Sequence, residues 1–476
     1  MKNSVIYSFI LLFLFGITQI FAQNFNDALR LSEPGFGSNA RALGMGNSYV
    51  AISDDYSGTI FNPAGLGLVK RMEISGTMDF NSFENNTTFF KNETNYSNST
   101  TSMNQFGCVF PMPTIQGSLV FGLGFNQLKN FNRVTKFDGF NPSSSMINNL
   151  TGMNDDIIYD LYLSYNNGGD DQTVIDGNLN QSGTKLEEGS LNSWAFSGSV
   201  EMAENLFVGA TLNILSGDYK SDREYYEDDT KDFYGSSVLT DPSEQRTADF
   251  QYFFMNDIID WNLSGWDFKM GFLYRLPLRG AIGATIKFPS DFTIEEKYFV
   301  DASSYFGSGN EFYINPVEDE VEYEISTPYQ FELGGSFFIT SLLLSGQVGF
   351  TNYSDMEFTL GLDPDHRSEN NRDIKDLFDT AINYNFGLEY TIPYIDLSVR
   401  AGYMVRQSPY KVDTSEFDKK YFTGGLGIIL NNSTALDFAY VHGSWKDYSD
   451  NYGSNQSRVY QDISTDNLIF TFSYRY

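Results

Sequence analysis

The chain has 476 residues, which suits a mid-sized barrel or two domains better than one ordinary soluble domain. Its 61 acidic and 30 basic residues leave a net charge of −31, which argues against a nucleic-acid-binding protein because such a protein needs a basic face. After the first two dozen residues no apolar run reaches the roughly 18 residues of a membrane helix, so a helical membrane protein is not expected.

Residues 1–22 have the pattern of a secretory signal peptide. Lys2 gives a positive start, residues 6–15 are apolar, and Ala22 is a small residue at the expected cleavage point. We therefore expect a mature chain that begins at Gln23 and lies outside the cytoplasm. No cysteine follows the apolar stretch, so a lipoprotein is not expected.

Residues 23–71 show no alternation of apolar and polar residues and are predicted to form loop and short helix. A short helix of small residues is expected within Ala40–Ala51. Gly44 and Gly46 permit close approach of the backbone to neighbouring chain. Asn62-Pro63 marks a turn, because the residue before a proline avoids the helical region.

From residue 72 to residue 476, about fourteen segments alternate apolar and polar residues with a period of two. In the last ten residues, Leu468, Phe472 and Tyr474 fall on one face, whereas Ser473 and Arg475 fall on the other. Ten alternating residues match a tilted strand that crosses a bilayer. Charges on the second face predict a polar lumen with lipid on the first face, and they include Lys287, Glu332, Glu389, Arg400, Asp437 and Arg475.

The connections between these segments alternate in length. Short ones lie at 111–116, 201–205, 276–279, 339–341, 392–395 and 431–433, and long polar ones lie at 82–101, 132–191, 218–261, 291–328, 352–381, 407–420 and 444–466. Short inner turns and long outer loops are the arrangement of an outer-membrane barrel, and an even number of strands places both chain ends on the periplasmic side. The longest loop contains a segment, 146–165, that is compatible with a short helix.

The sequence therefore predicts an all-β fold, a transmembrane antiparallel barrel of about fourteen strands in the outer membrane of a Gram-negative bacterium. A barrel of this size needs a plug or leaves a channel, so residues 23–71 are expected to plug the lumen from the periplasmic side. Gly122 and Gly124 mark either a kink in the third strand or a place where the wall is crowded by the plug.

Few residues suit catalysis or metal binding. The lone Cys108 excludes an intramolecular disulfide, and with only His366 and His442 neither a zinc site nor a hydrolase dyad is expected. His366 is interpreted as a solvated residue in an acidic loop. We predict no enzymatic activity, no metal and no cofactor. Acidic runs such as 222–232 are interpreted as a solvated surface, with bridging of divalent cations to lipid phosphates left open.

The runs ARALGMG, NSYVA and FNPAGL between residues 37 and 67 resemble the amino-terminal plug of the FadL-like outer-membrane transporters for long-chain fatty acids and other hydrophobic compounds. The strand count and the closing aromatic strand extend the resemblance over most of the mature chain. The resemblance implies ligand capture by outer loops, an internal pocket, a shift of the plug and sideways exit beside a kinked strand. Its gating residues would be Gly44, Gly46, Asn62, Pro63, Ala64 and Gly65, and the kink would lie at Gly122 and Gly124.

The implied partners are a fatty-acid-like ligand, outer-membrane lipid and lipopolysaccharide, and the barrel-assembly machinery, which would recognise the last strand although it ends in Tyr476 rather than phenylalanine. The chain is expected to be a monomer. Some relatives with the same plug motif shuttle proteins in type IX secretion, so that role stays an alternative, and a general porin is disfavoured by the plug. A lipid-sized apolar pocket joined to a lateral gap would favour transport, whereas an open docking surface of loops would favour the shuttle.

Overall fold

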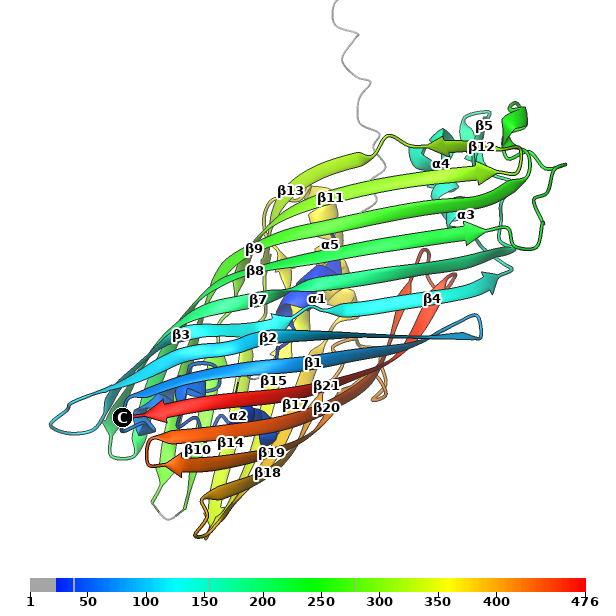
Figure 1. Cartoon of the computed structure of the whole chain (residues 1–476). Helices are drawn as coiled ribbons and strands as arrows, with labels where there is room; N and C mark the ends of the chain where they lie inside the picture. The colour runs from blue at the N-terminus through cyan, green and yellow to red at the C-terminus, as the bar shows by residue number, and fades with distance from the viewer. Residues whose placement is uncertain (1–22, 37–38, 154, 278) are drawn as a thin grey trace, which may run out of the picture.

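The computed structural model describes residues 23–36, 39–153, 155–277 and 279–476, so the predicted signal peptide lies outside the described residues. In this part of the chain fourteen antiparallel strands close into a barrel (Figure 1). Closure is direct, because β1 (Glu73–Phe89) pairs with β2 (Asn92–Met112) on one side and with the last strand, β21 (Arg458–Arg475), on the other. The predicted all-β barrel with an amino-terminal plug is confirmed.

Most barrel strands are continuous, and each pairs with its neighbours along the chain. They are β7 (Leu179–Ala203), β8 (Leu206–Asp228), β9 (Phe250–Leu276), β15 (Leu342–Asn352), β17 (Thr380–Ile392), β18 (Leu397–Arg406), β19 (Lys419–Asn431) and β20 (Thr434–Asp450). Others are interrupted along their length: β3 (Leu119–Asn130) is followed by β4 (Arg133–Asn141), β10 (Gly280–Lys287) by β11 (Asp291–Phe306), and β13 (Val317–Ser326) by β14 (Gln330–Ile339). Short strands outside this count are β5 (Tyr165–Asn167), β6 (Asp170–Gln172), β12 (Asn310–Tyr313) and β16 (Glu357–Phe358).

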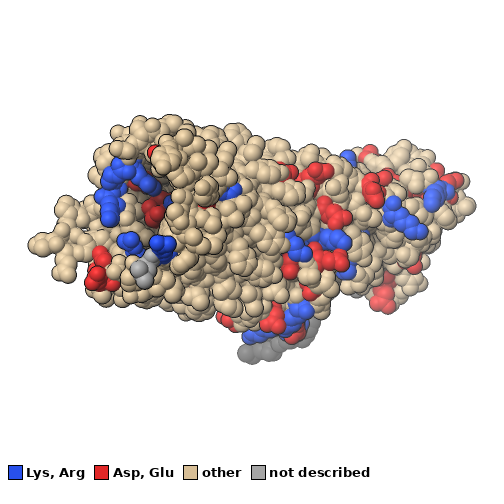
Figure 2. Space-filling view, turned by 90° about the horizontal axis from the view of Figure 1, so that it is seen from below, with Lys and Arg blue, Asp and Glu red and all other residues tan. Residues whose placement is uncertain are grey.

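The two faces of each strand differ as the alternation predicts. Along β21, Leu468, Phe472 and Tyr474 are exposed on the outside, whereas Thr471 and Ser473 are buried against the lumen. We call the outward band of exposed apolar side chains the apolar belt, and Figure 2 shows few charged side chains across it. None of the helices in the described ranges is long and apolar enough to cross a membrane.

The predicted long loops are partly wrong, because many of their residues extend the strands. The segment 82–101 forms most of a β1–β2 hairpin with its turn at Phe90–Lys91, and about half of 218–261 belongs to β8 and β9. At roughly 3.3 Å per residue, the 23 residues of β8 are more than twice as long as a bilayer core of about 30 Å. The strands therefore project well past the apolar belt and form a head.

The head has a hydrophobic core of its own. Phe89, Tyr225, Phe250 and Phe306 are fully or almost fully buried there and come from four different strands. The short helices α3 (Met146–Thr151) and α4 (Asp156–Asp160) cover this core, in the segment where a helix was predicted. A packed core explains why strands this long stay ordered outside the belt.

A second core lies lower in the barrel, where the plug reaches its outer half. Helix α1 (Phe25–Ser32) packs there on wall residues such as Trp261 and Tyr323 and close to helix α5 (Pro364–Leu377). The interpretation of His366 as a solvated loop residue is wrong. His366 is largely buried in α5, and its Nε2 lies 3.0 Å from the carbonyl oxygen of Gln23. Asp363 and Pro364 begin the helix as its cap and first residue, which is why an acidic run became helical.

Candidate functional site

The plug consists of short helical pieces joined by tight turns. After α1 come α2 (Ala40–Gly44) and two 3-10 helices, η1 (Tyr56–Thr59) and η2 (Pro63–Leu68). The helix predicted within Ala40–Ala51 is thus shorter than expected, because Gly46 and Asn47 adopt positive φ angles of 60° and 53° and end it.

The glycines of the plug motif lie where backbone meets backbone. A Cβ on Gly46 would come within 2.7 Å of the carbonyl oxygen of Phe386 in the wall, and a Cβ on Gly44 would lie 3.2 Å from Gly425 Cα. A Cβ on Gly65 would lie 2.4 Å from Ser53 within the plug itself. The plug therefore packs closely against the wall and against itself at these three glycines, and there is no space for a side chain at any of them.

The Asn-Pro-Ala turn is fixed to both plug and wall. Asn62 is fully buried, and its Nδ2 donates to the carbonyl oxygens of Val50, at 2.8 Å, and Phe272, at 3.0 Å. Its Oδ1 accepts a hydrogen bond from the backbone N–H of Ala64 at 3.0 Å, and Pro63 begins η2. A single amide side chain thus closes the turn and ties it to strand β9.

Lumen-facing charges that the alternation picked out bind the plug. Arg400 Nε lies 2.6 Å from Glu389 Oε2, and its Nη1 lies 2.6 Å from Asp437 Oδ1. Arg41 of the plug contacts the same Glu389 carboxylate at 3.0 Å and Asp54 at 2.6 Å. Because Arg400, Glu389 and Asp437 are largely buried, removing one partner would leave an uncompensated charge.

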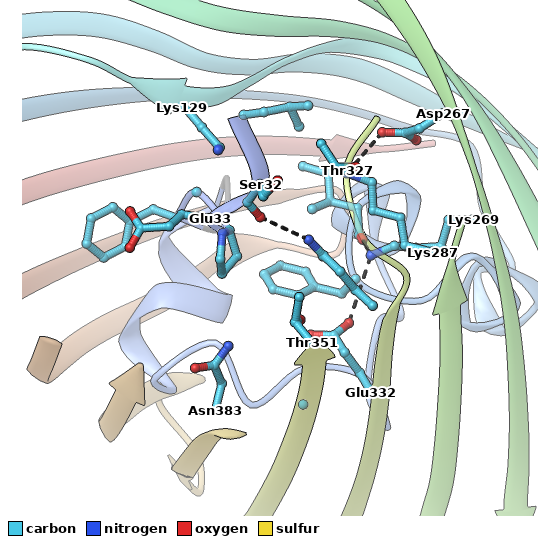
Figure 3. Close-up of a pocket in the computed structure, with 18 of the residues that line it drawn as sticks. Ser32, Glu33, Lys129, Asp267, Lys269, Lys287, Thr327, Glu332, Thr351 and Asn383 are labelled. Atoms are coloured by element: carbon cyan, nitrogen blue, oxygen red, sulfur yellow. Dashed lines mark hydrogen bonds and ion pairs between the residues drawn. The ribbon is translucent and has the colours of Figure 1, made fainter. Parts of the chain in front are cut away.

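A cavity of about 160 Å³ lies between the outer and inner parts of the plug (Figure 3). Its apolar lining includes Leu31, Phe61, Leu128, Leu215 and Phe292. Among the described residues, four cations and three carboxylates also line it, namely Lys129, Lys269, Lys287, Arg406, Glu33, Asp267 and Glu332. A slight excess of positive charge is notable in a chain with a net charge of −31. The cavity is thus amphipathic, not a dry tunnel.

Several of these cations hold the plug through its carbonyl groups. Lys129 Nζ donates to the carbonyl oxygens of Arg30, at 2.6 Å, and Leu31, at 2.7 Å. Arg406 donates to the carbonyl oxygens of Pro34 and Gly35. The last turn of α1 and the connection that follows it are therefore held by positive side chains from two strands far apart in the barrel.

The other two lysines face each other across neighbouring strands. Lys269 of β9 is directly opposite Lys287 of β10, an arrangement that is unfavourable without compensation. Asp267 lies 3.1 Å from Lys287 Nζ, and Glu332 lies 3.9 Å from Lys269 Nζ, as Figure 3 shows. These two ion pairs compensate the facing lysines and make this part of the inner wall of the barrel polar.

The pairing of β2 with β3 ends beside this cavity. The two strands pair only from Met112↔Leu119 to Gln105↔Asn126, and the register of β3 on β7 shifts between Gln127 and Lys129. Leu128 and Lys129, at the shift, line the cavity. On the outer surface near the end of the pairing, Met103 is 53% exposed in the apolar belt. We call this interruption the β2–β3 seam.

Gly122 and Gly124 lie below the seam, where the register of β3 is regular on both sides. A Cβ on Gly122 would be 3.1 Å from Thr59, and a Cβ on Gly124 would be 2.3 Å from the hydroxyl of Tyr56. Both contacts are with the plug, so these glycines give space to plug side chains. The irregularity in this strand is at Gln127–Lys129.

Tyr56 was not singled out from the sequence, yet it lies at the centre of this region. Its ring is fully buried, and a Cβ on Gly107 of β2 would come within 2.1 Å of it. Gly107 and Gly124 are paired across β2 and β3, so the ring occupies a socket of two glycines just below the seam. The backbone N–H of Tyr56 donates to Glu73 at 3.0 Å, and Glu73 pairs with Arg475 at 2.6 Å.

Comparison with solved structures identifies the architecture. The Pseudomonas putida toluene transporter TodX matches with a TM-score of 0.56 and 14% identity, over 93% of this chain and 99% of that one. A Pseudomonas aeruginosa FadL homologue matches with a TM-score of 0.58 and 11% identity, over 94% and 99%. This is the fold of the FadL-like outer-membrane channels. No family model and no curated protein matches the chain.

At these identities the likeness to the FadL-like channels establishes the fold alone. Of the residues predicted to gate the channel, those at 44, 46 and 62–65 lie between plug and wall or within the plug. The cations Lys129 and Arg406 were missed, although both face inward on alternating strands.

Proposed function

We propose that this protein is a passive outer-membrane channel for hydrophobic small molecules that carry a carboxylate, such as long-chain fatty acids. The observation that carries the proposal is the cavity, which combines apolar side chains with Lys129, Lys269, Lys287 and Arg406 beside the β2–β3 seam. A neutral hydrocarbon forms no hydrogen bond or ion pair with these cations, whereas a carboxylate binds strongly to charged N–H donors.

The size of the cavity supports a two-step passage. A cavity of about 150 Å³ lined by apolar side chains is enough for benzene, so the 160 Å³ found here accepts a head group and a short part of a chain. A longer tail needs additional space, which only movement of the plug provides. Burial of the tail away from water, at roughly 25 cal/mol per Å², supplies free energy for that movement.

The cations link ligand binding to the plug. Lys129 at present donates to carbonyl oxygens in the last turn of α1, and Arg406 donates to those of the connection that follows it. A carboxylate in the cavity competes with these neutral acceptors and forms the stronger charge-assisted bond. The bound anion therefore releases residues 30–35 and loosens the plug at its outer end.

The β2–β3 seam is the proposed exit. It borders the cavity through Leu128, and on the outer surface it lies near the exposed Met103 of the apolar belt. A tail that leaves here enters hydrocarbon without crossing water. Tyr56, held in the glycine socket below the seam, is the proposed closing element. An amphipathic cavity inside the barrel favours this transport role over the secretion shuttle, which needs an open docking surface.

Titration calorimetry on the full-length protein, with oleate as ligand and toluene as a neutral probe, tests the proposal. We expect saturable binding of oleate, and the Lys129→Met/Arg406→Met variant should bind it about tenfold more weakly because two charge-assisted bonds are lost. Lys297→Met, an exposed lysine on β11, is the matched control and should bind like the wild type. Failure of both oleate and toluene to bind at any concentration would contradict transport of hydrophobic compounds.

A further inference from the structure

A second cavity lies at the tip of the head, far from the lumen. Its volume of about 340 Å³ falls within the roughly 300–1,000 Å³ of small-molecule sites. The walls come from the β1–β2 turn, the loop after β4, the segment before β7 and the β20–β21 turn. Its lining side chains include Phe90, Ser144, Asn148, Asp176, Asn455 and Gln456. We call this cavity the tip pocket.

The floor of the tip pocket is a buried polar network that fixes its walls. Ser144 Oγ lies 3.0 Å from the hydroxyl of Tyr452 and donates to the carbonyl oxygen of Gln456 at 3.2 Å. Gln181 Nε2 donates to that hydroxyl at 2.6 Å and to Glu227 at 2.8 Å. Gln181 and Glu227 are fully buried, so loops that are distant in sequence are held in one arrangement before any ligand arrives.

The walls of the tip pocket offer neutral hydrogen-bonding groups together with one carboxylate. Asn148 Nδ2 donates to Asp176 Oδ1 at 2.8 Å, which leaves the second carboxylate oxygen available. The side-chain amides of Asn455 and Gln456 make no hydrogen bond within the described part of the chain. None of the described lining residues is Lys or Arg, which disfavours a phosphate or another anion. Paired donors and acceptors suit hydroxyl groups, because each hydroxyl both donates and accepts.

Phe90 adds an aromatic wall at an unfavourable backbone position. Phe90 and Lys91 form the two-residue β1–β2 turn with φ angles of 44° and 75°. Turns of this kind prefer Asn and Gly, and a bulky residue with positive φ is an outlier. The Phe90 ring packs edge-to-face on Phe89, with ring centroids 4.8 Å apart, yet the residue stays 39% exposed and its free surface lines the tip pocket. Strain of this kind concentrates where a side chain has a function.

We propose that the tip pocket binds a neutral sugar unit. The ring of Phe90 contacts the C–H face of the pyranose, and Asp176, Asn148 and the amides of the β20–β21 turn bind its hydroxyl groups. The pocket lies among the loops of the head, beyond the apolar belt, so its ligand is either a free monosaccharide or the terminal unit of a surface glycan. This site is independent of the proposed transport function.

Saturation-transfer NMR on the full-length protein in a zwitterionic detergent without sugar tests the proposal. The probes are the methyl glycosides of glucose, galactose, mannose and N-acetylglucosamine, and, separately, the polysaccharide released from lipopolysaccharide. We expect saturable binding of at least one probe. Binding of a glycoside identifies a free sugar as sufficient, whereas binding of the polysaccharide alone identifies a glycan end. Absence of saturable binding of every probe up to about 10 mM would overturn the proposal.

Phe90→Asn is the decisive variant, because Asn suits a positive φ angle and leaves the turn at least as stable. It should lower affinity by about tenfold or more while the folded barrel is retained. Lys91→Asn relaxes the same turn but keeps the ring, so it should bind within about twofold of the wild type. Unchanged binding by Phe90→Asn would refute the aromatic contact and with it the sugar site.

Discussion

Replacement of Tyr56 by alanine should open the channel. The ring is fully buried, and its walls include the backbone at Gly107 and Gly124, which have no side chains to fill the space left behind. Truncation of a buried aromatic residue costs about 3–5 kcal/mol, and poor collapse of the site favours the upper part of that range. Since about 1.4 kcal/mol is a factor of ten, displacement of the plug should become at least about a hundredfold more frequent.

Conductance in planar bilayers measures this effect, with Tyr56→Phe as the control that keeps the ring. A double-mutant cycle sharpens the test, because a Cβ on Gly107 would meet the Tyr56 ring at 2.1 Å. Gly107→Ala should therefore be harmful alone but should partly compensate Tyr56→Ala by filling its space. Wild-type conductance in Tyr56→Ala, together with additive effects in the cycle, would refute the assignment of Tyr56 as the closing element.

Three other predictions concern the plug, its ion pairs and the head. Deletion of residues 23–65 should leave a barrel with raised conductance in planar bilayers, and unchanged conductance would exclude the plug as the barrier. Arg400→Met leaves Asp437 without a cation and Glu389 with Arg41 alone, and it should cost about 3–5 kcal/mol, seen as a lower temperature for the gel-mobility shift of the barrel; an unchanged temperature would contradict it. Burial raises the pKa of Glu227 in the head from its ordinary 4.5 to about 7, so the folded head holds this proton more tightly than the unfolded one. The resulting stability is present below pH 4.5 and is lost as pH rises through 7, by at most about 3 kcal/mol. Hydrogen exchange of α3 at pH 5.5 and 8, corrected for intrinsic rates, should show this loss in the wild type and not in Glu227→Gln.

The barrel was predictable because its signal is strictly local. Alternation along β21 placed Ser473 toward the lumen and Tyr474 toward lipid before any contact was known, and the structure agrees. Alternation of apolar and polar residues failed to predict strands beyond the belt. Outward residues of β8 such as Asp218 and Asp222 are polar there, so the alternation stops although the strand continues. There the strands are held by the core of the head, whose members come from distant segments. A sequence pattern that depends on lipid contact cannot detect strands held by such a core.

The candidate site was only partly predictable. Alternation assigned Lys287 to the lumen, but its direct opposition to Lys269 depends on the register of β9 and β10. Lys129 and Arg406 line the same cavity as these two lysines only because the barrel closes and the plug passes between the strands that carry them. The plug motif drew attention to its glycines, whereas the role of Tyr56 depends on the glycines of two other strands.

In the proposed function, this barrel carries hydrophobic carboxylates across the outer membrane. Uptake of radiolabelled oleate by cells that lack their own fatty-acid channel tests it most directly, with barrel insertion verified in each strain. We predict saturable uptake above that of cells without the protein, and clearly slower saturation in the Lys129→Met/Arg406→Met variant. Uptake equal to that of cells without the protein, with the barrel correctly inserted, would contradict the account.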